Sequence, residues 1–292
     1  MPTIDEKRVY TDNSGTETVY LATGLGVVAV SVSDDLIGEF GVAERCHARD
    51  VATAGPLVAV ATDEDVLVAD RSAADGDASS APGPSDTLDF AGTGFGPASA
   101  VGFDAGALLA GDEEGRIGRC AAPGDAASDE NKGDATWTNV GSAGAVRAID
   151  GGLVAAADGV YHVDDSGATH AGLDDARDVD AEPLVATGSG LFKLGNGWMD
   201  VLSDPVDAVD AVGTRALAVS EGTLYARDPD ADTDEEAWHE EALPVDGDVV
   251  AVAHGAASSY AVTADGTLAV RLGDDEWRHR GLGVRDVAAA AV

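Results

Sequence analysis

The sequence has few lysines, cysteines and aromatic residues, and it has no long apolar run. Lysine supplies only three of the 17 basic residues, against 54 acidic ones, so the formal net charge of the 292-residue chain is −37. The chain therefore lacks the clustered Lys and Arg side chains with which nucleic-acid-binding proteins neutralise phosphates. It also lacks the basic surface that docks on an anionic membrane. No segment approaches the roughly 18 consecutive apolar residues of a membrane span. We expect neither a nucleic acid nor a membrane as a partner.

The two cysteines, Cys46 and Cys120, lie far apart, and neither has a CxxC or CxxH neighbour. This spacing argues against a disulfide framework and against a zinc site. The first residues, Met-Pro-Thr-Ile-Asp-Glu-Lys-Arg, do not place an apolar segment behind a basic head. We therefore expect no secretory signal, a cytoplasmic protein, and no metal or other cofactor.

The negative charge comes mainly from aspartate, which supplies 39 of the 54 acidic residues. Hydrophobic residues make up 45% of the chain, enough to form a core rather than a disordered polymer. High Asp content with little Lys is typical of proteins from salt-accumulating halophilic archaea, where molar salt screens the repulsion between carboxylates. The alternative, an acidic mesophilic protein, would more often contain Glu and Lys in quantity. We interpret the charge as an adaptation to the solvent.

Internal repeats indicate the fold. Residues 48–70 read ARDVATAGPLVAVATDEDVLVAD, and related segments occupy 98–120, 146–165, 176–202, 206–228 and 249–271. Each copy contains apolar runs of a strand's length, separated by Asp- and Gly-containing turns. A further strand led by an aromatic residue follows most copies; these residues are Trp137, Trp198, Trp238 and Trp277. No apolar pattern of helical period is present, so we expect almost no helix.

The unit starts predict a closed ring of blades. They lie at residues 48, 98, 146, 176, 206, 249 and 284. The mean period of about 40 residues is typical of four-stranded propeller blades. The last unit, 284–292, contains one strand only, and its missing strands are found at 18–42. We predict an all-β fold in which residues 1–292 form a single seven-bladed β-propeller of antiparallel blades. The C-terminal strand joins the N-terminal blade and removes the exposed sheet edges. Residues 5–11 are left over.

The segment LVATGSGLF (184–192) resembles the repeats of WD40- and YVTN-like seven-bladed propellers. The whole chain resembles a haloarchaeal β-propeller family of unassigned function. The Gly-His and Trp-Asp pairs of true WD40 repeats are missing, as are the Asp box of sialidases and a quinone-binding dehydrogenase motif. The resemblance therefore implies a fold and no chemistry.

One column of aligned residues is a candidate ligand-binding site. The second positions of the units are Arg49, Ser99, Arg147, Arg177, Asp207, Val250 and Arg285. Four guanidinium groups around one channel mouth would bind a carboxylate or phosphate bidentately. The alternative is a structural Arg–Asp ring that holds the blades together. Its acids would be Asp50, Asp178 and Asp286 beside three of the arginines, and Asp150 and Asp180 three residues after two of them.

Two further features have structural explanations. The ends of the next strands form a column rich in hydroxyls, which we expect to bind turn backbone groups. That column contains Thr23, Thr62, Gly111, Ala157, Thr187, Ser220 and Thr263. The long loops 71–86, 121–134 and 228–237 should lie on the opposite face of the ring. The last of them, with Glu241, has calcium-loop spacing at Asp230, Asp232 and Asp234, but it has Glu235 where such a loop needs Gly.

The sequence therefore favours a monomeric, non-catalytic scaffold that binds a protein or a small anion. The alternative is a hydrolase or lactonase with a metal held in the central channel by Asp150, Asp180 and Asp210, which occupy one column in three consecutive units.

Overall fold

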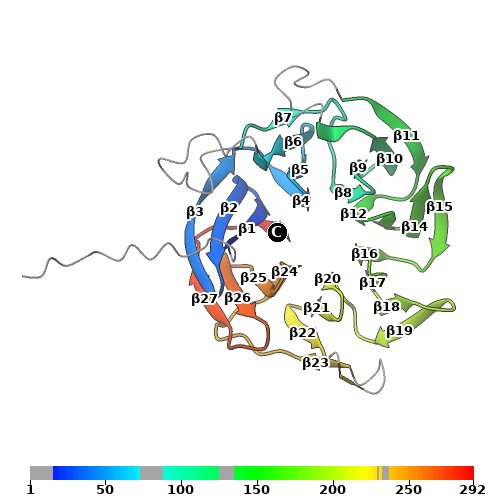
Figure 1. The fold of residues 1–292 in the computed structure, drawn as a ribbon. Coiled ribbons are helices and arrows are strands. Elements are labelled where there is room, and N and C mark those ends of the chain that lie inside the picture. The colour runs from blue at the N-terminus through cyan, green and yellow to red at the C-terminus, as the bar shows by residue number, and fades with distance from the viewer. Residues whose placement is uncertain (1–15, 73–87, 125–134, 229, 232–236) are drawn as a thin grey trace, which may run out of the picture.

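The computed structural model describes residues 16–72, 88–124, 135–228, 230–231 and 237–292. The described part of the chain forms 28 strands, arranged in seven four-stranded sheets around a central axis (Figure 1). Blade 1 contains β28 (Val287–Ala291), β1 (Thr16–Thr23), β2 (Gly26–Ser33) and β3 (Leu36–Glu44). Blade 2 contains β4 (Ala48–Ala54), β5 (Leu57–Thr62), β6 (Val66–Asp70) and β7 (Ala91–Gly92). Blade 3 contains β8 (Ala100–Asp104), β9 (Ala107–Gly111), β10 (Arg116–Cys120) and β11 (Trp137–Ser142).

The other four blades repeat this order from the centre outward. Blade 4 contains β12 (Val146–Asp150), β13 (Leu153–Ala156), β14 (Gly159–Asp164) and β15 (Gly167–Gly172). Blade 5 contains β16 (Ala176–Asp180), β17 (Leu184–Thr187), β18 (Gly190–Leu194) and β19 (Trp198–Leu202). Blade 6 contains β20 (Ala208–Val212), β21 (Arg215–Ser220), β22 (Thr223–Arg227) and β23 (Trp238–Glu240). Blade 7 contains β24 (Val249–His254), β25 (Ser258–Thr263), β26 (Thr267–Leu272) and β27 (Arg278–Gly281).

Blade 1 is built from both ends of the chain, as the sequence predicts. Strand β28 pairs antiparallel with β1, with Tyr20 opposite Ala291 and Ala22 opposite Ala289. The predicted seven-bladed, antiparallel propeller closed by the C-terminal strand is thereby confirmed.

The core lies between the blades. Each of the seven clusters of buried apolar residues in the described part of the chain spans one pair of neighbouring blades. Second strands such as β9 and β17 are buried along their whole length, because both faces of the sheet are covered by other blades. This burial explains why these strands read as continuous apolar runs rather than as alternating ones.

Side chains of the outer strands also connect the blades. The indole of Trp137 donates a hydrogen bond to the Thr93 carbonyl, and that of Trp198 donates to the Ala171 carbonyl, in each case of the preceding blade. The hydroxyl column has the expected structural role in its threonines. For example, Thr23 and Thr187 donate to the carbonyls of Gly26 and Gly190 across the following turn.

The two faces of the ring are distinct. The inner strands begin at one face, which we call the entry face, and end at the other, the exit face. None of the helices in the described residues has the length and hydropathy that a membrane crossing requires.

Candidate functional site

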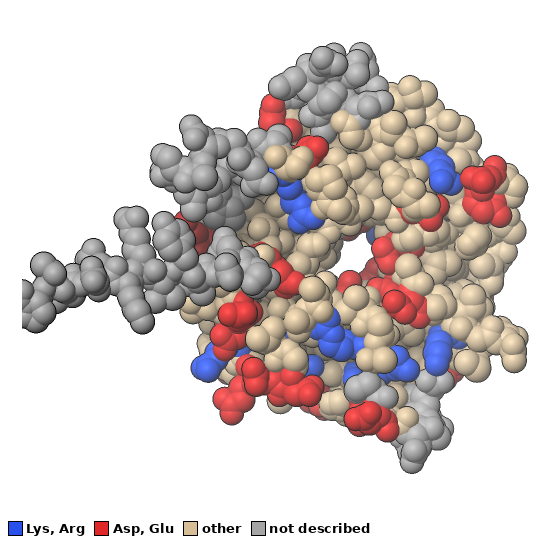
Figure 2. Space-filling view, viewed as in Figure 1, with Lys and Arg blue, Asp and Glu red and all other residues tan. Residues whose placement is uncertain are grey.

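A central channel runs between the seven inner strands, and acidic side chains lie beside its opening (Figure 2). It encloses a cavity of about 430 Å³, to which residues of all seven blades contribute. Because each inner strand is the edge of its sheet, its outward N–H and C=O groups face this channel unless a side chain covers them.

Arg49, Arg147 and Arg177 line the channel at the entry face, as the sequence column predicts. Each of these arginines lies where the pairing register of its inner strand shifts. Such a β-bulge redirects a side chain out of the regular alternation. We call these three residues the arginine layer. The fourth predicted residue, Arg285, precedes β28, is exposed and does not line the cavity.

The arginine layer is paired with acids of the following blade. The guanidinium of Arg147 lies 2.6 Å from Asp175, and that of Arg177 lies 2.5 Å from Asp207. Arg177 also lies 3.6 Å from Asp175, so these groups form a chain across blades 4, 5 and 6. Arg49 reaches Glu113 in the turn between β9 and β10, at 3.2 Å. Arg285 has no ion pair within the described residues.

These partners are not the acids expected from sequence adjacency. Asp50 and Asp178 each accept two backbone N–H bonds instead of pairing with the neighbouring arginine. The expectation of a ring built from these acids is therefore wrong. The β-bulge at each arginine makes its side chain point in a different direction from the side chain of the next residue.

Four channel carboxylates connect neighbouring inner strands in the same way. When residues are counted from the start of each repeat unit, each carboxylate accepts a hydrogen bond from the backbone N–H that lies one position later in the unit of the next blade. The pairs are Asp50 with Val101 (2.9 Å), Asp150 with Ala181 (2.8 Å), Asp178 with Val209 (2.8 Å) and Asp180 with Ala211 (2.8 Å). These bonds satisfy edge N–H groups that otherwise face the channel.

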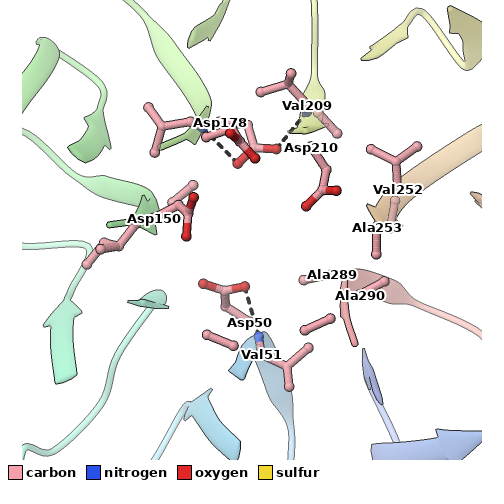
Figure 3. A pocket seen from close by; sticks show the side chains of 18 of the residues that line it. Asp50, Val51, Asp150, Asp178, Val209, Asp210, Val252, Ala253, Ala289 and Ala290 are labelled. Carbon is pink, nitrogen blue, oxygen red and sulfur yellow. Dashed lines mark hydrogen bonds between the residues drawn. The ribbon is translucent and has the colours of Figure 1, made fainter. Parts of the chain in front are cut away.

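Four of the carboxylates around the cavity, those of Asp50, Asp150, Asp178 and Asp210, are labelled in Figure 3. Burial raises the pKa of Asp50 and of Asp210 to about 8. Neighbouring carboxylates add to the effect in both, whereas the charge of Arg215 acts against it at Asp210. Burial also raises the pKa of Asp178 to about 7. The physical cause is desolvation, which disfavours the charged form of a carboxyl group.

Asp210 has a side chain as its partner in the next blade. Its Oδ2 lies 2.6 Å from Nδ1 of His254. Counted from the start of each unit, His254 lies one position later in blade 7 than Asp210 does in blade 6, as in the four backbone pairs. The His254 side chain is only 2% exposed. Burial, followed by the nearby charges of Arg215 and Arg271, lowers the pKa of His254 to about 3, so its ring is neutral at physiological pH.

The alternative interpretation of Asp150, Asp180 and Asp210 as a metal centre finds no support in this geometry. Within the described residues, no three His, Cys, Asp or Glu side chains are placed to hold one ion. Asp180 uses both of its oxygens for backbone N–H groups, those of Glu182 and Ala211. The calcium-loop spacing cannot be placed, because Asp232 and Asp234 lie outside the described residues, as do residues 5–11 and most of the loops at 71–86 and 121–134.

The sequence interpretation did not recognise His254 as a member of the site, nor the bonds that the carboxylates form. The sequence did contain a signal for these bonds, because the two residues of several pairs lie one repeat unit apart in the sequence. Asp150, Asp178 and Asp180 each lie 31 residues before their partner.

Comparisons with known proteins agree with this fold. No curated protein sequence matches the chain significantly. The WD40 β-propeller domain of Doa1 superposes with a TM-score of 0.60 at 14% identity, covering 93% of this chain and 89% of that one. A chain of the nidogen/laminin complex gives 0.54 at 9% identity, with 95% and 98% covered. YCF48 bound to D1 peptide gives 0.52 at 13% identity, with 91% and 85% covered. These likenesses show the fold alone. A family model described as "Beta-prop_HVO_0234:-like, beta propeller" matches residues 3–292, and the chain belongs to this family.

Proposed function

We propose that this protein is a non-catalytic scaffold that holds an anionic group of its partner, a carboxylate or a phosphate, at the arginine layer. We further propose that it works as a monomer in the cytoplasm of a halophilic archaeon, a setting supported by its net charge of −37.

The observation that carries the proposal is the exposure of the ion pairs at the entry face. The side chains of Arg49, Arg147 and Arg177 are 30%, 37% and 33% exposed. Their acidic partners are more exposed still, for example 72% for Glu113 and 50% for Asp207. Exposed ion pairs contribute about 0–1 kcal/mol each, so an incoming carboxylate or phosphate can replace the acid on a guanidinium at little cost. Arginine suits this role because its planar group binds such anions through two parallel hydrogen bonds.

One further observation supports a binding role. Two of the structural neighbours are described as a nidogen/laminin complex and as bound to D1 peptide. By analogy of fold alone, a propeller face is suited to a protein partner.

The test is calorimetric titration of the whole chain with citrate and with inorganic phosphate, in molar KCl. We expect binding that weakens about tenfold in Arg177→Ala, which is a change of about 1.4 kcal/mol. The matched control is Arg278→Ala, because Arg278 also forms an exposed ion pair, with Asp35, but away from the channel. We expect Arg278→Ala to bind as the wild type does.

The free energy of unfolding distinguishes this proposal from a purely structural role of the arginine layer. If the arginine layer binds a ligand, urea unfolding of Arg177→Ala should change by less than about 1 kcal/mol, because its ion pairs are exposed. A loss of about 1–3 kcal/mol together with unchanged anion binding would show that the layer only holds the blades together.

A further inference from the structure

One acid of the entry face lies between two arginines of the arginine layer. Oδ1 of Asp175 lies 2.6 Å from Nη1 of Arg147 in blade 4, and its Oδ2 lies 3.6 Å from Nη2 of Arg177 in blade 5. Among the described residues, Glu113 and Asp207 each pair with only one arginine of the layer. Asp175 therefore presents its two oxygens to two guanidinium groups, in the way that a bound carboxylate ligand is held. We call the space between these two groups the carboxylate subsite.

Both arginines of the carboxylate subsite also have partners other than Asp175. Arg147 donates a hydrogen bond to the Ala176 carbonyl at 3.0 Å, and Arg177 donates to Asp207 at 2.5 Å. These bonds hold the two guanidinium groups in place independently of Asp175. The subsite is therefore preorganised for an anion, whichever carboxylate occupies it.

The repeat does not require an acid at the position of Asp175. This residue immediately precedes the start of the unit in blade 5. At the same position the other six units have His47, Pro97, Ala145, Pro205, Asp248 and Gly283. The backbone of Asp175 lies in the left-handed region, with a φ of 49°, as does that of Leu173, with a φ of 59°. Such conformations are unfavourable for residues other than glycine, and they cluster at binding sites and switches.

Gly188 provides the space that the Asp175 carboxylate occupies. It lies in the turn between β17 and β18, and its N–H donates to the Asp175 carbonyl at 3.1 Å. A Cβ atom at Gly188 would lie 2.1 Å from Oδ2 of Asp175 and 3.1 Å from Nη2 of Arg177. The backbone of Gly188 is outside the left-handed region. Glycine is therefore needed here for space, and alanine would fill the subsite without straining the backbone.

We propose that Asp175 is an internal stand-in for the ligand, and that a carboxylate of the partner displaces it from between Arg147 and Arg177. This inference rests on the proposed function and deepens it, because it names the subsite, the class of anion and the competing group. The side chain of Asp175 is 49% exposed, so it can turn into solvent when it is displaced. A carboxylate fits better than a phosphate dianion, because its single charge is repelled less by the nearby Asp207 and by the displaced Asp175.

The charge state of Asp175 agrees with a competition between carboxylates. The hydrogen bond from Arg147 lowers the pKa of Asp175, slight burial acts against this effect, and the charges of Arg147 and Arg177 add to it. Asp175 is therefore ionised at neutral pH and competes with an incoming anion for the arginines. A ligand binds more weakly, in apparent terms, when its site is open in only a fraction of the molecules. Removing the competing charge should therefore strengthen binding.

The experiment is calorimetric titration of the full chain, in molar KCl, with the peptide Gly-Glu-Gly blocked at both ends. We expect Asp175→Asn to bind this peptide roughly tenfold more tightly than the wild type, because asparagine keeps the size of the side chain and tolerates the left-handed backbone. The control is Asp174→Asn, which removes the exposed charge next to it. This control should bind as the wild type does, because the Debye length is about 3 Å at 1 M salt. Equal strengthening in the two variants, or none in Asp175→Asn, would overturn the proposal.

Gly188→Ala tests where the incoming carboxylate lies. If the ligand takes the place of Asp175, the added methyl group occupies the position of its oxygen, and Gly-Glu-Gly should bind about tenfold more weakly. If the ligand binds the arginines elsewhere, the methyl group only expels Asp175, and binding stays equal or becomes stronger. That second result would also overturn the proposal. Circular dichroism and urea unfolding verify that each variant is folded. If Gly188→Ala does not fold, the comparison of Asp175→Asn with Asp174→Asn decides alone.

Arg177→Ala separates this inference from the proposed function. Weaker binding in Arg177→Ala without stronger binding in Asp175→Asn would leave the anion site in place and reject the stand-in. Unchanged binding in Arg177→Ala would contradict both.

Three further probes identify the ligand class. The blocked peptide Gly-Gln-Gly, which lacks the charge, should not bind, and equal binding of the two peptides would contradict a carboxylate ligand. Acetate that binds as tightly as Gly-Glu-Gly identifies a free small carboxylate as the ligand, whereas tighter binding of the peptide identifies a protein side chain. Inorganic phosphate that binds Asp175→Asn more tightly than Gly-Glu-Gly does would overturn the assignment to a carboxylate.

Discussion

The carboxylate of Asp178 in blade 5 accepts a hydrogen bond of 2.8 Å from the backbone N–H of Val209 in blade 6. Its second oxygen accepts the N–H of Val179 in its own strand, at 2.9 Å. Asp50 makes the corresponding pair of bonds with Val51 and with Val101 of blade 3. These carboxylates therefore connect blades through channel-facing edge N–H groups, which no neighbouring strand satisfies.

Replacing Asp178 by alanine should destabilise the propeller by about 1–3 kcal/mol. The change leaves the backbone N–H of the buried residue Val209 without its acceptor. Urea unfolding at constant KCl measures the effect. Asp200→Ala, on the exposed face of β19, removes the same charge without a blade contact and should change the free energy of unfolding by less than about 0.5 kcal/mol. Equal effects of the two substitutions would mean that charge, and not the hydrogen bond, determines the result.

The raised pKa values in the channel predict that stability falls as the pH rises. Burial raises the pKa of Asp50, Asp178, Asp180 and Asp210 to about 8, 7, 7 and 8, against about 4 in an unfolded chain. The folded state therefore holds more protons than the unfolded state between pH 4 and pH 8, and this stabilisation is lost as the pH passes through the folded-state values.

The lowered pKa of His254 makes the stability rise with pH, but only below about pH 6.5. The difference in the free energy of unfolding between pH 6.5 and pH 9 therefore reports on the carboxyl groups. We expect the free energy of unfolding to fall by about 2–4 kcal/mol over that interval, measured by urea unfolding in molar KCl. The slope should be smaller in Asp210→Asn, because an amide does not titrate. A flat or rising profile in the wild type would contradict the raised values.

The number of blades and the closure of the ring were predictable because the repeats in the sequence show where each blade begins and which blade is incomplete. The unit starts at 48, 146, 176 and 249 coincide with the first residues of β4, β12, β16 and β24. The arginine column was predictable for the same reason. Its partners were not, since Asp207 and Glu113 approach Arg177 and Arg49 only through the packing of one blade on the next. His254 gave no signal of its own, because its role depends on Asp210 in another repeat.

Low salt should unfold the protein reversibly. With a net charge of −37, repulsion between surface carboxylates acts over a Debye length of about 30 Å at 0.01 M salt, against about 3 Å at 1 M. We expect the β-sheet circular dichroism to be lost on dialysis to about 0.01 M KCl and to return when KCl is restored. Sucrose at matched osmolality is the control, because it stabilises compact states without screening charge. A full β-sheet spectrum in low salt would contradict the interpretation of the charge as an adaptation to molar salt.

Deleting residues 284–292 should open the ring. The deletion removes β28, whose pairing with β1 extends from Thr23 opposite Val287 to Tyr20 opposite Ala291, so β1 becomes an exposed inner edge. It also uncovers Val19 and Leu21, which belong to the apolar cluster between blades 1 and 7 that Val284 and Val287 help to cover. An exposed edge with apolar side chains pairs readily with another chain. We therefore expect a lower melting temperature and a concentration-dependent shift to larger species in size-exclusion chromatography with light scattering.

Adding a peptide of sequence VRDVAAAAV, which is the deleted segment, should restore the monomer and part of the melting temperature, whereas a scrambled peptide of the same composition should not. A truncated chain that remains monomeric and melts as the full chain does would show that β28 does not hold the ring closed.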